Sequence, residues 1–223
     1  MASILASFST EAATALPFYT LQDFEAFGQS MRHISGATLF AYTPYLPNEA
    51  FREEWETHAQ ENQAWFAQSH TLMDNKQTVK YPEQMKVPLR IWRETNITAT
   101  RIIDNTGPPY APLWLLSPPP PDTSRLNLNL YRRGDFVDQL EFVRKKEYDA
   151  LSAPRPVDQW LGSALPRNEE DDSPLSVLMH PIESSLEAPQ AFFAAVVSAV
   201  IPFSVYFTNV GTCFVSDTNV TSN

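Results

Sequence analysis

Histidine and carboxylate side chains are the groups of this sequence that could bind a metal or transfer a proton. His58 and Glu61 lie three residues apart in a segment with helical periodicity, and His70 follows further along. Residues three apart share a helix face, so this pair could hold a metal through two side chains. The sequence offers no third ligand of suitable spacing, and we favour the alternative of a solvated helix face. We therefore predict no metal site.

His180 and Cys213 are two further side chains with acid–base or nucleophilic chemistry. His180 precedes a proline in an apolar segment, where a hydrogen-bonded core histidine is more common than a catalytic one. Cys213 lies between Thr212 and Phe214, and we interpret it as a buried, inert thiol. The sequence contains no P-loop, dinucleotide glycine fingerprint, nucleophile elbow or zincin helix. We therefore predict that the chain is not an enzyme and needs no cofactor.

Aromatic side chains beside expected strands are a better indication of a binding site. Trp92, Tyr110 and Trp114 lie in or next to such strands, and Leu128 and Asn129 belong to a segment in which leucine and polar residues alternate. Ligand pockets are mostly apolar, with a few polar groups that orient the ligand. We take these five residues as the candidate ligand-binding site. The alternative is that the aromatic side chains simply fill the core.

Composition and charge restrict the kinds of partner. The chain has 223 residues, of which 43% are hydrophobic and 12% aromatic, so it can bury a core of its own. A net charge of −10 argues against nucleic acid and anionic membrane surfaces as partners. The 19 prolines and only 6 glycines indicate stiff connections and argue against glycine-rich phosphate loops. A single cysteine excludes an intrachain disulfide.

An uncharged apolar run covers residues 191–207 and is long enough to raise the question of a membrane span. Pro202 interrupts the run, Ser198 and Ser204 dilute it, and no lysine or arginine flanks it. We predict a buried valine-rich strand, a break at Pro202 and a short second element. Residues 1–13 have no basic start and no apolar core, so we predict no secretory signal peptide.

Periodicity and turn signals predict an α+β fold built on antiparallel sheets, because the order of elements lacks the regular crossover rhythm of a parallel sheet. Helices are expected at three places and short strands between and after them. The first predicted helix starts with a capping box at residues 20–23 and is closed by Gly36. The other predicted helices cover 48–69 and the segment that follows Asp135, and the predicted strands cover 37–42, 90–93, 98–103, 110–116, 126–131 and 175–182.

Three segments, in this order, resemble the CHASE domain, which is the extracellular sensory domain of receptor-type nucleotide cyclases and histidine kinases. Residues 24–59 match its opening helix, strand and second helix, with Pro44, Arg52, Glu53 and Trp55 in the family's places. The sequence YAPLWLLSPPP is similar to the family's strand that runs into a proline. SPLSVLMHPI and the later FFAAVVSAVIPFSVYFTNV resemble its second half, where the chain returns as paired strands.

The resemblance implies a fold, a location and a function. It implies an N-terminal stalk helix (1–35), a distal PAS-like antiparallel-sheet module (36–164) and an incomplete, membrane-proximal PAS-like module (165–223). The implied function is to sense a small-molecule ligand outside the cell for a guanylate or adenylate cyclase. This chain is then a receptor fragment. The helices that link it to the membrane and the catalytic domain both lie outside it. CHASE-like receptors often act as dimers, so a homodimer is implied as well.

Two alternatives of other classes stay open at this point. The first is a small soluble hydrolase that uses His58 or His180 with a nearby carboxylate. The second is a structural or partner-binding domain, in which residues 191–207 dock against another chain or a bilayer.

Overall fold

The computed structural model describes residues 16–73, 88–95, 100–121, 123–146, 149–154, 174–184 and 192–205. They form a mixed α+β fold with antiparallel sheets, which confirms the predicted fold class at that level. The helices are α3 (Phe24–Ser35), α4 (Glu49–Glu61), α5 (Ala64–Met73) and α6 (Gly134–Lys146). The strands are β1 (Leu39–Pro44), β2 (Trp92–Glu94), β3 (Arg101–Ile103), β4 (Leu115–Ser117), β5 (Ala150–Leu151), β6 (Leu175–Glu183) and β7 (Phe193–Pro202).

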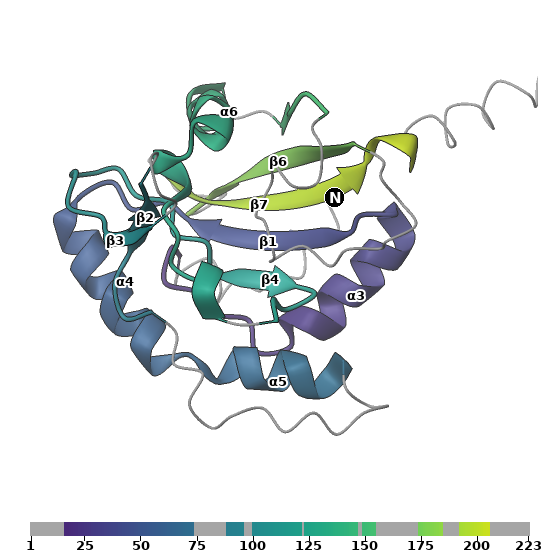
Figure 1. Ribbon diagram of the computed structural model, residues 1–223, viewed down its shortest axis with the longest axis horizontal. Helices are drawn as coiled ribbons and strands as arrows, with labels where there is room; N and C mark the ends of the chain where they lie inside the picture. Colours follow the sequence, from purple (N-terminus) through teal and green to yellow (C-terminus); the bar gives the residue numbers. More distant parts are fainter. Residues whose placement is uncertain are drawn as a thin grey trace, which may run out of the picture.

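One five-stranded antiparallel sheet with the order β4-β1-β7-β6-β5 organises the molecule (Figure 1). Tyr42 of β1 pairs with Val197 of β7 on one side and with Leu115 of β4 on the other. Strands β2 and β3 form a separate two-stranded sheet. The large sheet therefore contains strands from both sides of the expected module boundary at residues 164 and 165, where the resemblance implied two sheets.

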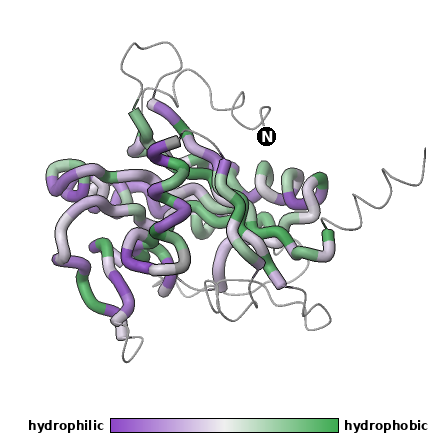
Figure 2. The backbone as a smooth tube through the Cα atoms, turned by 90° about the horizontal axis from the view of Figure 1, so that it is seen from above, coloured by the Kyte–Doolittle hydropathy of each residue, from purple (hydrophilic) through white to green (hydrophobic). Residues whose placement is uncertain are grey.

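The predicted valine-rich strand in the apolar run is confirmed as β7. Every residue from Ala194 to Pro202 is buried, and β7 pairs with β1 along one edge and with β6 along the other. Because both edges of β7 are hydrogen-bonded, a strand this apolar can lie in the middle of the sheet. In Figure 2, the tube through the middle of the molecule is coloured mostly as hydrophobic. No helix within the described ranges combines the length and the apolar character of a membrane span.

Helix α3 ends as the sequence predicts, but it begins at Phe24 with no side-chain cap, where the sequence predicted a capping box at residues 20–23. Gly36 closes the helix in the left-handed conformation, with φ of 69°, and its N–H donates to the Arg32 carbonyl over 2.9 Å. Gly28 faces β4 so closely that a Cβ there would lie 2.0 Å from Ser117 Oγ. Only glycine allows this approach, so α3 rests directly on the edge strand of the sheet.

The predicted helix over residues 48–69 is wrong as a single element, since two helices cover it. Asn48 caps α4 as expected, because its side chain accepts a hydrogen bond of 3.0 Å from the Phe51 N–H. At Asn62 both the backbone N–H and the side-chain amide donate to the His58 carbonyl, over 3.0 and 2.9 Å. This local bonding competes with continued helix, and α5 begins after a short turn.

The predicted strand over residues 126–131 is also wrong. The segment forms a turn, two isolated bridges and a 3-10 helix at Leu130–Arg132. Asn127 has a φ of 59°, which extended backbone does not allow, and the Asn129 side chain accepts from the Tyr131 N–H. The leucines and both asparagines are all buried, so their alternation does not separate an inner from an outer face.

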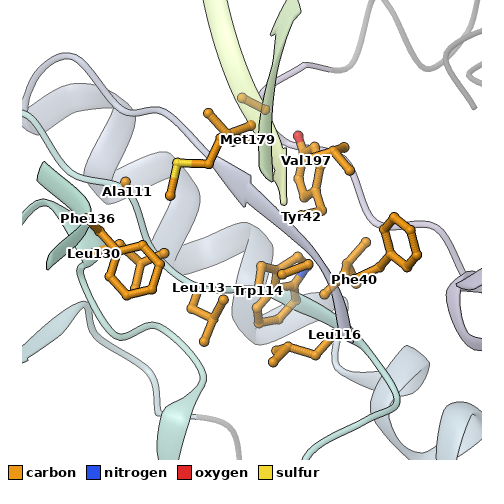
Figure 3. Close-up of a cluster of buried hydrophobic side chains, with 14 of the residues drawn as sticks. Phe40, Tyr42, Ala111, Leu113, Trp114, Leu116, Leu130, Phe136, Met179 and Val197 are labelled. Carbon is orange, nitrogen blue, oxygen red and sulfur yellow. The ribbon is translucent and has the colours of Figure 1, made fainter. Parts of the chain in front are cut away.

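The core fills the space between the large sheet and the surrounding helices. Trp114 is fully buried and makes T-shaped contacts with Trp55 of α4 and Trp65 of α5, at centroid distances of 5.3 and 5.7 Å. Phe136 of α6 is buried and lies with Met179 of β6 in the cluster of Figure 3. In Figure 1, α3 and α5 lie near β4, and α6 lies near β6.

Candidate functional site

The five residues predicted to bind a ligand all lie in the core. Trp92 is 4% exposed, and Tyr110, Trp114, Leu128 and Asn129 are 0% exposed. Backbone bonds bring most of them together: the Asn129 N–H donates to the Trp92 carbonyl over 2.8 Å, and Trp92 and Leu128 form a bridge. Leu128 and Asn129 therefore belong to one irregular segment at 126–130, and Trp92 is bonded to it. Trp114 lies in the part of the core that faces the helices.

Protein partners occupy the polar atoms of these aromatic residues. Trp92 Nε1 donates to the Leu126 carbonyl over 2.7 Å, and Trp114 Nε1 donates to Thr20 Oγ1 over 3.0 Å. The Tyr110 hydroxyl donates to a Glu49 carboxylate oxygen and accepts from Arg52 over 3.2 Å. In this arrangement the aromatic residues tie elements of the core together, and their role in ligand binding stays a prediction.

Asn129 is the centre of a buried polar network that also contains Asp104. Its Oδ1 accepts from the N–H groups of Ala111 and Tyr131 over 2.9 and 3.1 Å, and its Nδ2 donates to Asp104 Oδ2 over 2.6 Å. These bonds satisfy both ends of a side-chain amide that has no access to solvent. The network fixes the loop before β4 against the 3-10 helix at Leu130–Arg132.

Asp104 is a buried carboxylate that sequence reasoning missed. Its carboxylate accepts from the N–H and hydroxyl of Thr106, at 3.0 and 2.5 Å, and from Arg132 Nε at 3.2 Å. Burial alone raises the pKa of Asp104, but the bonds from Thr106 and Asn129 and the charge of Arg132 together bring it below its ordinary value. The Asp-x-Thr-Gly turn sequence at 104–107 was the available signal.

Asn127 joins the same irregular segment to α4. Its Oδ1 accepts from Trp55 Nε1 over 3.0 Å, and its Nδ2 donates to the Pro88 carbonyl over 2.6 Å. In an alternating strand Asn127 and Asn129 would lie on the face opposite the leucines, yet both are 0% exposed. In place of the hydrogen bonds of a regular strand, their side-chain amides bond to segments that are distant in the sequence. No local sequence pattern predicts such bonds.

His58 forms an arrangement with Thr20 and Asn62 that has the outline of a nucleophile, a base and an orienting residue. Its Nε2 lies 2.9 Å from Thr20 Oγ1 and its Nδ1 lies 3.2 Å from Asn62 Nδ2. Asn62 Nδ2 also donates to the His58 carbonyl, which assigns it as the donor to Nδ1. The imidazole proton then sits on Nε2 and points at Thr20, so this tautomer cannot accept the hydroxyl proton.

The surroundings of His58 correct the prediction of a solvated helix face. The imidazole packs at centroid distances of 5.3 Å from Trp55 and 6.3 Å from Phe18. Burial lowers the pKa of His58, so the neutral form dominates near pH 7. His70, predicted on the same solvated face, is 5% exposed and its Nε2 lies 2.9 Å from the Pro120 carbonyl oxygen.

His180 is hydrogen-bonded as predicted, but it is half-buried on β6 rather than in the core. Its Nδ1 lies 2.5 Å from Asp149 Oδ1, and Asp149 is about half exposed. Within the described ranges no hydroxyl or thiol bonds to its Nε2, and no group of three potential ligands surrounds a metal position. Cys213 lies outside the described residues.

No protein-family model matches the sequence, and no curated protein matches it significantly.

Proposed function

We propose that this chain is a non-catalytic, ligand-sensing extracellular domain of a receptor-type nucleotide cyclase. One observation carries the proposal: three segments far apart in the sequence, each with a CHASE-like pattern, supply four neighbouring strands of one sheet. Residues 24–59 contain β1, residues 110–120 contain β4, and the third segment, 173–210, contains both β6 and β7.

The order of strands supports a PAS-like module, and we propose one such module that combines both expected parts. The first and the last strand of the sheet in chain order, β1 and β7, pair in its interior, and all pairings are antiparallel. The chain leaves β1 through α4, α5 and the β2–β3 hairpin before it returns as β4. A rigid sheet that carries long connections suits a domain in which loops recognise the ligand.

Helix α3 is suited to carry a signal from the sheet to the N-terminal stalk. It forms the last twelve residues of the stalk expected over residues 1–35. Arg32 donates both to Ser117 Oγ of β4 and to Glu25, whose carboxylate lies 2.9 Å away. Together with the close approach at Gly28, these contacts couple a shift of β4 to α3. A ligand shifts such an equilibrium only by its different affinity for the two states.

Immunoprecipitation from solubilised membranes of the source cells tests the proposal. An antibody raised against residues 16–73 is expected to capture a polypeptide far larger than 25.2 kDa, together with guanylate or adenylate cyclase activity. Preincubation of the antibody with the recombinant chain is the control and should abolish both. Capture of a 25.2 kDa protein without cyclase activity would contradict the proposal.

A further inference from the structure

Arginines gather around the β2–β3 hairpin in a chain whose overall charge is strongly negative. Between residues 90 and 133 the sequence has six arginines and three carboxylates, whereas the whole chain has a net charge of −10. No lysine occurs between residues 87 and 144. The planar guanidinium presents paired N–H groups that match phosphate and carboxylate oxygens, which an ammonium group does not. The local cationic excess is therefore of the type that recognises an oxyanion.

Two of these arginines bond to Glu94, and a third, Arg101, lies opposite it in the hairpin. Glu94 and Arg101 are directly opposite in the register of β2 and β3, so their side chains share one face of the hairpin. Arg125 bonds to Glu94 Oε1, and Arg133 Nη1 lies 3.4 Å from Oε2. Both carboxylate oxygens thus have an arginine partner other than Arg101. Arg101, Arg125, Arg133 and Glu94 together carry a net charge of +2.

Arg101 is held in place by an aromatic ring instead of a carboxylate. Its guanidinium carbon lies 4.7 Å from the centroid of the Trp92 ring. The ring itself is fixed, because Trp92 is buried and its Nε1 donates to the Leu126 carbonyl. Arg101 is exposed, and within the described part of the chain it forms no ion pair. A guanidinium stacked in this way keeps its N–H edges available to a ligand.

We propose that Arg101, Arg125 and Arg133 form a binding site for the dianionic phosphate group of a small molecule. The net charge of +2 on these three arginines and Glu94 is equal in size and opposite in sign to the charge of the dianion. Arg125 and Arg133 are only 21% and 18% exposed and are oriented by Glu94, so little side-chain freedom is lost on binding. The biological role of this site rests on the proposed sensory function, in which a phosphate-bearing compound would be the signal.

Isothermal titration calorimetry of the full chain with inorganic phosphate tests the site. We expect saturable binding, and we expect Arg101→Gln to weaken it by about tenfold or more, because charge-assisted hydrogen bonds are lost. Arg90→Gln is the matched control: Arg90 is exposed, carries the same charge and lies outside the cluster around Glu94, so affinity should not change. Sulfate, also a tetrahedral dianion, should compete, whereas acetate at equal ionic strength should not.

Glu94→Gln provides a second variant with the opposite expectation. Removal of the Glu94 carboxylate raises the net charge of these four side chains from +2 to +3, and phosphate should bind more tightly than to the unmodified chain. The ligand of the site could be an organic phosphate or free inorganic phosphate, and titration with methyl phosphate distinguishes them. Tighter binding of methyl phosphate than of inorganic phosphate indicates an organic phosphate, and the reverse order indicates free phosphate.

Absence of saturable phosphate binding, or equal affinity in Arg101→Gln and Arg90→Gln, would overturn the site. Neither result bears on whether a membrane cyclase contains this chain, so the two proposals fail independently.

Discussion

Gly28→Ala is the substitution whose consequence follows most directly from the geometry. The added Cβ would lie 2.0 Å from Ser117 Oγ and 2.2 Å from Ser117 Cβ, and contacts under 3.0 Å essentially never occur for Cβ atoms. Rotation of the hydroxyl cannot relieve this overlap, because the Cβ of Ser117 is itself too close. Helix α3 must therefore move away from β4, and the bond from Arg32 to Ser117 is weakened at the same time.

The expected loss of stability combines three contributions. Overpacking costs about 1–3 kcal/mol, and the disturbed Arg32 bond adds roughly 1 kcal/mol. The higher helix propensity of alanine stabilises the folded state by about 0.5–1 kcal/mol and offsets part of this loss. The free energy of unfolding should fall by about 2 kcal/mol, which corresponds to a Tm lower by roughly 4–8 °C for a domain of this size.

Urea unfolding followed by tryptophan fluorescence measures this difference, since Trp114 and Trp65 lie in the core beside α3 and β4. Gly134→Ala is the control: no atom lies within 4 Å of its added Cβ, so stability should stay equal or rise slightly. Ser117→Gly should remove most of the penalty of Gly28→Ala in the double variant. A Gly28→Ala variant as stable as Gly134→Ala would refute the close seating of α3 on the sheet.

Three further predictions concern Asn127, Asp104 and the dependence of stability on pH. Asn127→Gly keeps the left-handed backbone but leaves Trp55 Nε1 without its acceptor, so unfolding free energy should fall by about 2–3 kcal/mol. Asp104→Asn removes the acceptor of Arg132 and places an amide against the Asn129 amide, and should cost about 2 kcal/mol in the same urea assay. Stability should also fall with acid: Asp104 and Glu141 have lowered pKa values in the folded state, about 2 for Glu141, chiefly through its bond from Arg144. Their contribution is present above about pH 4.5, the unfolded value, and is lost as the pH falls toward 2.

Each of these predictions has an outcome that contradicts it. Unchanged stability of Asn127→Gly would mean that the Trp55 bond does not form in solution. An Asp104→Asn variant with the same acid midpoint and the same stability as the unmodified chain would show that Asp104 is not ionised in this network. A stability that is constant between pH 5 and 2.5 would contradict the lowered pKa values of both carboxylates.

Local patterns predicted those elements whose stability has local causes. The α3 helix follows from apolar spacing and a glycine cap at Gly36, and β7 follows from a valine-rich run that only a central strand can bury. The break at Asn62 was missed because the competing bonds return to His58 within a segment of strong helical periodicity. Here a single side chain outweighs the pattern around it.

The candidate site was harder to predict for a physical reason. Trp92 and Tyr110 have the composition of a pocket lining, but large aromatic residues fill cores and line pockets alike. What distinguishes the two is whether their polar atoms have protein partners, and these partners lie 34 and 61 residues away in the sequence. Asp104 and Arg101 were overlooked because an isolated charged residue in a turn or strand gives no periodic signal.

Long-read sequencing of the transcript that encodes this chain shows whether a receptor contains it. We expect the open reading frame to continue into apolar membrane spans and a nucleotide cyclase domain. A transcript whose frame begins at Met1 and stops after Asn223 would contradict the receptor function.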